Sequence, residues 1–97
     1  MNKIITILEA KVSEEKWDAL RNAYQAVKAK QTAPMPLQSF LLQMKEDPKL
    51  WRIVTVWESM EVLQKVRSSG QTPAGVLVFR EALAEPTLSI FEAKEEM

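Results

Sequence analysis

The chain has 97 residues, 46% of them hydrophobic and 27% charged, which is typical of one soluble globular domain over residues 1–97. Lysine plus arginine and aspartate plus glutamate number 13 each, so no net charge attracts nucleic acid or an anionic membrane surface. Histidine and cysteine are absent from the sequence, which excludes disulfides, Ser-His-Asp and Cys-His nucleophiles, and zinc sites of the usual nitrogen and sulfur type.

The first predicted elements are a strand and a helix. The run Ile4 to Leu8 is apolar and β-branched, which favours a strand with both faces at least partly buried. Ser13 offers an N-cap for a helix over residues 14–30, with acidic residues in the first turn. Apolar side chains at three- and four-residue steps predict the buried helix face: Trp17, Leu20, Tyr24 and Val27.

A hairpin follows this helix. The segment 31–36 contains Pro34 and Pro36, which cannot continue a helix. Residues 37–45 alternate as a strand, and the turn Glu46–Lys49, with Asp before Pro, predicts an antiparallel return. The strand after the turn is apolar on both faces, so each face needs a cover. Its two faces carry Trp51, Ile53, Thr55 and Trp57 on one side and Arg52, Val54, Val56 and Glu58 on the other.

Two further helices and a strand complete the chain. Ser59 offers an N-cap for a helix that the run Ser68-Ser69-Gly70 stops. Residues 73–85 fit a strand or a helix, and Pro73 at the start leads us to interpret them as a helix. Residues 87–92 alternate as the last strand.

The element order predicts an α+β fold. Strand-helix-strand-strand-helix-strand is the order of the ferredoxin-like βαββαβ unit, a four-stranded antiparallel sheet with helices on one face. The other sheet face is then bare, although apolar residues point to both faces of the first three strands. Such a patch is unusual on a soluble monomer. We therefore expect a homodimer in which two sheets pack face to face to form an α/β-barrel.

Two segments carry a resemblance to a known family. The stretch EDPKLWRIVTVWES, residues 46–59, and the stretch AEPTLSIFE, residues 84–92, follow the β-branched first strand. In this order and spacing they resemble the antibiotic biosynthesis monooxygenase domain family, whose members are dimeric α/β-barrel proteins. The family includes cofactor-independent oxygenases of quinols and phenols, haem-degrading enzymes, and domains with no known activity. The resemblance covers essentially the whole chain and implies a fold more firmly than a function.

The haem-degrading branch is the part of the family that this sequence fits least. Its members resemble the chain around Trp57, but they carry a second tryptophan and an iron-ligating histidine at the positions that hold Val66 and Val76 here. Because the chain has no histidine, a haem ligand of that kind is missing. We therefore expect neither haem nor another cofactor or metal.

The resemblance implies oxygenation of a small aromatic quinol or phenol. In that chemistry the substrate anion itself reduces dioxygen, and the protein supplies an apolar pocket and hydrogen-bond donors. The alternative is a non-catalytic dimeric domain that binds a small hydrophobic metabolite or serves in assembly. The candidate ligand-binding residues are Trp57, Thr55, Trp51, Tyr24, Phe40, Phe79, Phe91, Arg52 and Arg80. The aromatic residues among them could equally have a purely structural role in the core or the dimer interface, and Arg52 could equally form an ion pair. We expect a cytoplasmic protein that binds neither nucleic acid nor a membrane.

Overall fold

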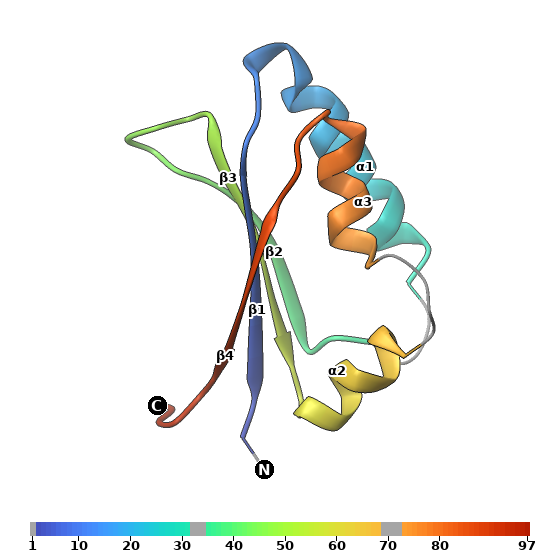
Figure 1. Cartoon of the computed structure of the whole chain (residues 1–97), viewed down its shortest axis with the longest axis vertical. Helices are drawn as coiled ribbons and strands as arrows, with labels where there is room; N and C mark the ends of the chain where they lie inside the picture. The colour runs from blue at the N-terminus through green and yellow to red at the C-terminus, as the bar shows by residue number, and fades with distance from the viewer. Residues whose placement is uncertain (1, 32–34, 69–72) are drawn as a thin grey trace.

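The computed structural model describes residues 2–31, 35–68 and 73–97, and it shows a four-stranded antiparallel sheet with its helices on one face (Figure 1). The strands are β1 (Ile4–Lys11), β2 (Gln38–Gln43), β3 (Leu50–Trp57) and β4 (Thr87–Glu92). The helices are the 3-10 turn η1 (Glu14–Lys16), α1 (Trp17–Ala29), α2 (Met60–Arg67) and α3 (Ala74–Glu81). The strand order β2-β3-β1-β4 confirms the predicted ferredoxin-like fold.

Strand register decides which side chains face the helices. In the antiparallel ladders, Thr55 of β3 lies opposite Thr6 of β1 on one side and opposite Ser39 of β2 on the other. Because side chains alternate along a strand, every second residue from these three faces the helices. The helix-facing residues of the two central strands are Ile4, Thr6, Leu8 and Ala10 of β1 and Trp51, Ile53, Thr55 and Trp57 of β3.

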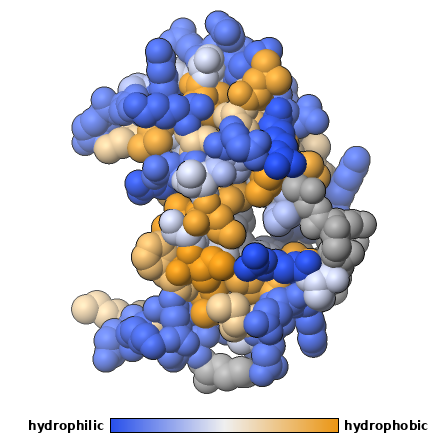
Figure 2. Space-filling model, in the orientation of Figure 1, coloured by the Kyte–Doolittle hydropathy of each residue, from blue (hydrophilic) through white to orange (hydrophobic). Residues whose placement is uncertain are grey.

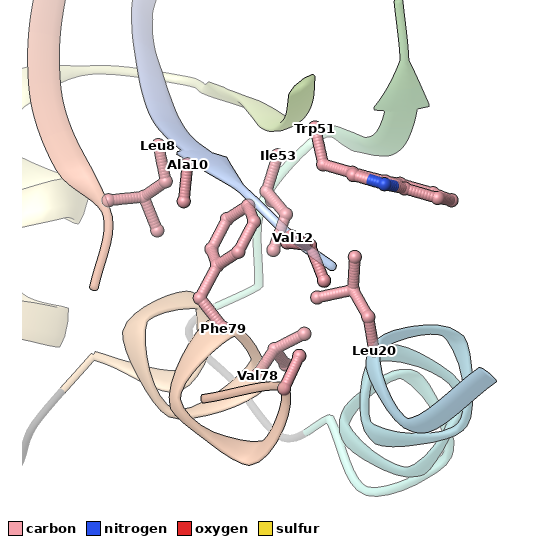
Figure 3. Close-up of a cluster of buried hydrophobic side chains, with 9 residues drawn as sticks. Leu8, Ala10, Val12, Leu20, Trp51, Ile53, Val78 and Phe79 are labelled. Carbon is pink, nitrogen blue, oxygen red and sulfur yellow. The ribbon is translucent and has the colours of Figure 1, made fainter. Parts of the chain in front are cut away.

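The core lies between the sheet and the two helices α1 and α3 (Figure 3). Phe79 of α3 points toward the strand residues Leu8 and Ile53, and Leu20 of α1 packs beside it. Phe79 and Leu20 are fully buried, and each such side chain contributes about 1.5–3 kcal/mol to stability. Trp17, Tyr24 and Val27 pack against this cluster, so the predicted helix stripe is confirmed.

The opposite face of the sheet carries no helix and is largely apolar; we call it the helix-free face. The register places Ile5 and Ile7 of β1 and Val54 and Val56 of β3 in its middle. Its edges expose Phe40, Leu42 and Phe91 by 46%, 45% and 54%. The face that the sequence predicts as a dimer interface is therefore present, and the pairing of two copies stays a prediction.

Within the described ranges, no helix has the length and apolarity that a membrane span needs.

The strands differ from the prediction at several boundaries, and β2 is shorter than the predicted range 37–45. β1 does not stop at Leu8, because Glu9 to Lys11 continue to pair with β3. The hairpin turn lies one residue later than predicted: the Leu50 amide donates to the Asp47 carbonyl at 2.9 Å. This position places Pro48 second in the turn, where its fixed φ suits a type I turn.

The helix boundaries match the sequence signals only in part. The Ser59 hydroxyl accepts a hydrogen bond from the Val62 amide at 3.3 Å, which confirms the predicted N-cap of α2. Ser13 precedes η1, but its side chain makes no capping bond, so that part of the prediction was wrong. The segment 73–85 contains the predicted helix as α3, but this helix ends at Glu81 and not at residue 85. The predicted breaks at Pro34 and Ser69-Gly70 lie outside the described residues.

Helix α3 ends in a hydrogen-bonded motif whose left-handed residue is a leucine. The Ala84 amide donates to the Phe79 carbonyl at 3.0 Å, and the Leu83 amide donates to the Arg80 carbonyl at 2.9 Å. These are the two bonds of a Schellman motif, in which glycine usually occupies the left-handed position. Leu83 has φ 56° and is 80% exposed, so burial does not offset its backbone strain.

Replacing Leu83 with glycine is expected to raise the free energy of unfolding. Removal of the Cβ clash raises the free energy of unfolding by about 1–2 kcal/mol. The additional conformational entropy that glycine loses on folding lowers it by about 0.5–1 kcal/mol. Urea denaturation measures the difference. Leu83→Ala keeps the Cβ atom and serves as the control without a gain. A glycine variant less stable than the natural protein would show that the Leu83 side chain makes a stabilising contact.

Candidate functional site

A cavity of about 730 Å³ lies between the helices and the helix-facing side of the sheet. Its floor comes from all four strands of the sheet, and its walls come from α1, α2 and the beginning of α3. In Figure 1, α1 and α3 cover the upper part of the sheet and α2 lies below them. Figure 2 shows apolar side chains gathered around the hollow between these two parts. The volume lies in the range of small-molecule sites in proteins.

A close approach of α3 to β1 shapes one part of this cavity. Gly75 lies in the first turn of α3, and a Cβ atom at this position would meet Leu8 Cδ1 at 2.6 Å. Both residues line the cavity. The absence of a side chain at Gly75 therefore lets the helix start pack directly on the Leu8 side chain.

A row of hydroxyl groups crosses the cavity floor; we call it the hydroxyl row. The Tyr24 hydroxyl donates to Ser39 Oγ at 2.8 Å, and Ser39 Oγ lies 3.5 Å from Thr55 Oγ1. Thr6 lies opposite Thr55 in the β1–β3 ladder and continues the row, where its Oγ1 accepts from Trp57 Nε1 at 3.1 Å. Each hydroxyl has one donor and two acceptor positions, so the row can also bind an oxygen atom of a ligand.

Trp51 lines the cavity, but its indole N–H is buried. Its side chain is almost fully buried, and its indole N–H has no hydrogen-bond partner among the described residues. The neighbouring Trp17 ring packs edge to face against it, with centroids 6.0 Å apart, while Trp17 Nε1 donates to the Val12 carbonyl at 3.0 Å. A buried donor without a partner costs about 1–3 kcal/mol.

The charged groups of the lining are all cations: Arg21, Lys28 and Arg67. Among the described lining residues there is no aspartate or glutamate. Residues 2–31, 35–68 and 73–97 also contain no group of three or more His, Cys, Asp or Glu side chains that could hold a metal ion. The polar and aromatic groups of the described lining are therefore hydroxyls, glutamine amides, indoles and cations.

The structure brings four of the predicted site residues together in the cavity lining: Trp51, Thr55, Trp57 and Tyr24. Phe40 also borders the cavity, but the register pairs it with Val54 and thereby places its ring on the helix-free face. We therefore do not count the Phe40 ring as a cavity wall.

The predicted residues of α3 lie elsewhere. Phe79 is fully buried in the core and is not part of the cavity lining. Arg80 Nη2 lies 2.9 Å from Glu85 Oε1 on the outer surface. Their hydrogen bonds raise the pKa of Arg80 and lower the pKa of Glu85. Only the beginning of α3, from residue 73 to residue 78, lines the cavity, and Phe79 and Arg80 lie about one turn further along the helix than Val76.

Arg52 and Phe91 also lie away from the cavity, on the helix-free face. Arg52 Nε donates to Glu9 Oε1 at 2.6 Å, which is the ion pair that the sequence suggested as its structural role. Phe91 of β4 pairs in register with Ile5 of β1 and is more than half exposed. These two residues belong to the surface that faces away from the helices.

Sequence reasoning missed two members of the hydroxyl row, Ser39 and Thr6, and the three cations of the lining. A signal for the first two was present: each is a small polar residue within an apolar strand, as Thr55 is. The cations gave no such signal, because exposed lysine and arginine on helices are ordinary.

Comparison with known sequences identifies a family. The sequence profile described as antibiotic biosynthesis monooxygenase matches residues 3–76 of the chain. Among curated proteins, no match to the chain is found.

Several solved structures share the fold over nearly their whole length. A conserved protein from Methanosarcina mazei Go1 has a TM-score of 0.74 and 16% identity, covering 97% of this chain and 95% of that chain. A Deinococcus radiodurans protein, provisionally named an antibiotic biosynthesis monooxygenase, has a TM-score of 0.72 and 14% identity, with the same coverage. SnoaB, a cofactor-independent oxygenase from Streptomyces nogalater, has a TM-score of 0.68 and 13% identity over 100% of this chain and 98% of that one. At these identities the similarity shows the fold alone.

Replacing Gly75 with alanine is expected to narrow the cavity without unfolding the protein. Alanine gains up to about 1 kcal/mol of helix propensity, and the new Cβ atom displaces the Leu8 side chain from its position 2.6 Å away. We expect the free energy of unfolding to change by less than about 1 kcal/mol. Binding of 2-naphthol, used as a probe with a flat apolar ring and one hydroxyl group, is expected to weaken several-fold. Thermal melting and titration calorimetry measure the two effects. Unchanged binding would show that the ligand does not contact the part of the cavity next to Leu8.

Proposed function

The chain belongs to the antibiotic biosynthesis monooxygenase family, and on this basis we propose that it is a cofactor-independent monooxygenase of a small aromatic quinol or phenol. The observation that carries the proposal is the combination of an apolar cavity with the hydroxyl row on its floor. The structural relative SnoaB, described as a cofactor-independent oxygenase, supports the reaction class.

The surroundings of the hydroxyl row suit a flat ring with one polar oxygen. On β3, Ile53 and Trp57 face the cavity two residues before and after Thr55, which places each roughly 7 Å from it along the strand. A phenolic oxygen at Thr55 would therefore leave the ring in contact with an aliphatic or an aromatic side chain. The apolar contacts would position the ring, and the hydroxyl row would fix its orientation.

The same groups would stabilise the reactive form of the substrate. Hydrogen bonds from the hydroxyl row to a phenolate oxygen favour the electron-rich anion that reduces dioxygen. For a ring bearing a CH2 group, one oxygen atom of O2 becomes a carbonyl on that carbon. The other leaves as water with the two hydrogens of the CH2 group. The described lining has no carboxylate or imidazole, so the phenolic proton would leave through hydroxyl groups or water.

A second candidate function is ligand binding without catalysis. The observation that favours it is the same lack of a carboxylate or imidazole base in the described lining. A dimeric domain that only binds a hydrophobic metabolite needs the apolar cavity but no base. Oxygen uptake distinguishes the two functions.

We further propose that the functional unit is a homodimer formed through the helix-free face. Val54 is central on this face, because the register places it between Ile7 of β1 and Phe40 of β2. All three side chains are apolar, and the Phe40 ring is about half exposed in the single chain. Packing against the same face of a second copy would remove this apolar surface from water.

Oxygen uptake tests the proposed reaction. Purified, metal-stripped protein should consume O2 with a panel of quinols, anthrones and naphthols faster than protein-free autoxidation. Tyr24→Phe removes one hydroxyl of the hydroxyl row and should reduce kcat by about tenfold or more, in keeping with the loss of an oxyanion donor. Arg80→Gln lies outside the cavity lining and should leave the rate unchanged. Uptake no faster than autoxidation would favour the binding function, which ligand-induced shifts in Tm would then test.

Sedimentation velocity tests the homodimer. The natural chain should sediment at twice its mass of 11.1 kDa at micromolar concentration. Val54→Asp places a charge at the centre of the helix-free face and should yield a monomer, because an unpaired buried charge is strongly unfavourable. Gln64→Asp, on the exposed side of α2, is the matched control and should remain a dimer. A natural chain that is monomeric at this concentration would contradict the proposal.

A further inference from the structure

The charge of the cavity lining differs from the charge of the whole chain. The sequence has equal numbers of acidic and basic residues, 13 of each. The described lining contains three cations, Arg21, Lys28 and Arg67, and no carboxylate. A lining with positive charge of this kind attracts an anion and repels a cation.

Two of these cations lie beside the hydroxyl row. Arg21, Tyr24 and Lys28 are spaced by three and four residues on α1 and therefore lie along one face of the helix. Tyr24 is the helix member of the hydroxyl row through its 2.8 Å bond to Ser39. The two cations are thus placed about one turn before and one turn after the phenol that reaches the cavity floor.

The third cation approaches from another helix. Arg67 is the last residue of α2, and Figure 1 shows the C-terminal ends of α1 and α2 on the same side of the molecule. Lys28, in the last turn of α1, and Arg67 both line the cavity. We call the part of the lining that they form the cationic rim.

The cations of the rim are available to a ligand. Among the described residues, neither Lys28 nor Arg67 has an ion-pair partner, and Arg21 is only 4.0 Å from the exposed Asp18. Five of the ten cations outside the lining are instead paired within 3.5 Å of an acid: Lys3, Lys11, Arg52, Arg80 and Lys94.

Helix dipoles explain part of this arrangement and leave part unexplained. A cation in the last turn of a helix offsets the negative end of the dipole, and both Lys28 and Arg67 occupy such positions. Arg21 lies near the middle of α1, where the dipole has little effect. The dipole also does not explain why the described lining lacks carboxylates.

The hydroxyl row on the cavity floor can donate hydrogen bonds as well as accept them. We infer that the ligand is an aromatic carboxylate, with the ring in the cavity and the carboxylate at the cationic rim. This inference rests on the proposed function in taking the cavity as the substrate site, and it narrows the substrate class from aromatic phenols to those that also carry a carboxylate.

A pair of probes that differ only in charge tests the inference. Calorimetric titration with 1-naphthoate and with its neutral isostere 1-naphthamide compares a carboxylate with an amide on the same ring. Naphthoate is expected to bind at least about fivefold more tightly than naphthamide, and added salt should weaken only the naphthoate complex. Equal binding of the two probes, tighter binding of the amide, or binding of neither would overturn the inference.

Charge-removing variants locate the carboxylate. Lys28→Gln and Arg67→Gln should each weaken naphthoate binding about twofold to fivefold, the range of a partly exposed ion pair, and leave naphthamide binding unchanged. Lys45→Gln, on the exposed hairpin outside the cavity lining, is the matched control and should change neither. A variant that weakens the binding of both probes equally would show that the cation has a structural role. That result would contradict the proposal that the cationic rim binds the carboxylate.

The results separate this inference from the proposed reaction. Oxygen uptake with neutral naphthols together with equal binding of the two probes would keep the oxygenase and overturn the carboxylate preference. Tight, salt-sensitive naphthoate binding without any oxygen uptake would keep the carboxylate preference and assign it to a binding domain.

Discussion

The pairing of β3 between β1 and β2 is the constraint on which the rest of the structure depends. This register places Thr55 between Ser39 and Thr6 on the helix side of the sheet, and it places Val54 between Ile7 and Phe40 on the other side. A slip of one residue would turn Arg52 toward the core and Trp51 away from it. The cavity floor and the helix-free face are therefore two consequences of one alignment.

The helices complete the cavity by covering the sheet unevenly. Phe79 and Leu20 fill the space under α3 and α1 with a close-packed core. Beyond this cluster, toward α2, the space is lined by side chains but not filled by them. Unfilled apolar space and a buried indole donor without a described partner both reduce stability. Such local departures from ideal packing are expected where a fold holds a ligand.

Much of the fold could be predicted from local patterns. Alternation in residues 51–57 predicted the two apolar faces of β3, and the Ser59 cap and Pro73 start located α2 and α3. The family resemblance read from the sequence is confirmed by the profile match. These signals depend on neighbours within one or two turns of chain, which the sequence shows directly.

The site was less predictable because its contacts join distant segments. Tyr24 and Ser39 are fifteen positions apart, and their hydrogen bond depends on how α1 lies across the sheet. Phe79 was a candidate site residue, but only the packing of α3 shows that its ring lies in the core and not in the cavity. The orientation of a helix around its own axis is a tertiary property, and the sequence of the helix alone does not determine it.

One face of β3 forms part of the cavity floor and the other lies on the helix-free face, and this limits how such a chain can diverge during evolution. An insertion or deletion within Leu50–Trp57 would exchange the two faces for every residue beyond it, so we expect length changes to be tolerated in the hairpin turn around Pro48 and not in the strand. Substitutions at alternate positions can instead alter one face and leave the other intact. The relatives in M. mazei and S. nogalater, at 16% and 13% identity, align over at least 95% of each chain. Diversity of ligands on this scaffold can therefore arise from exchange of side chains on a backbone of nearly constant length.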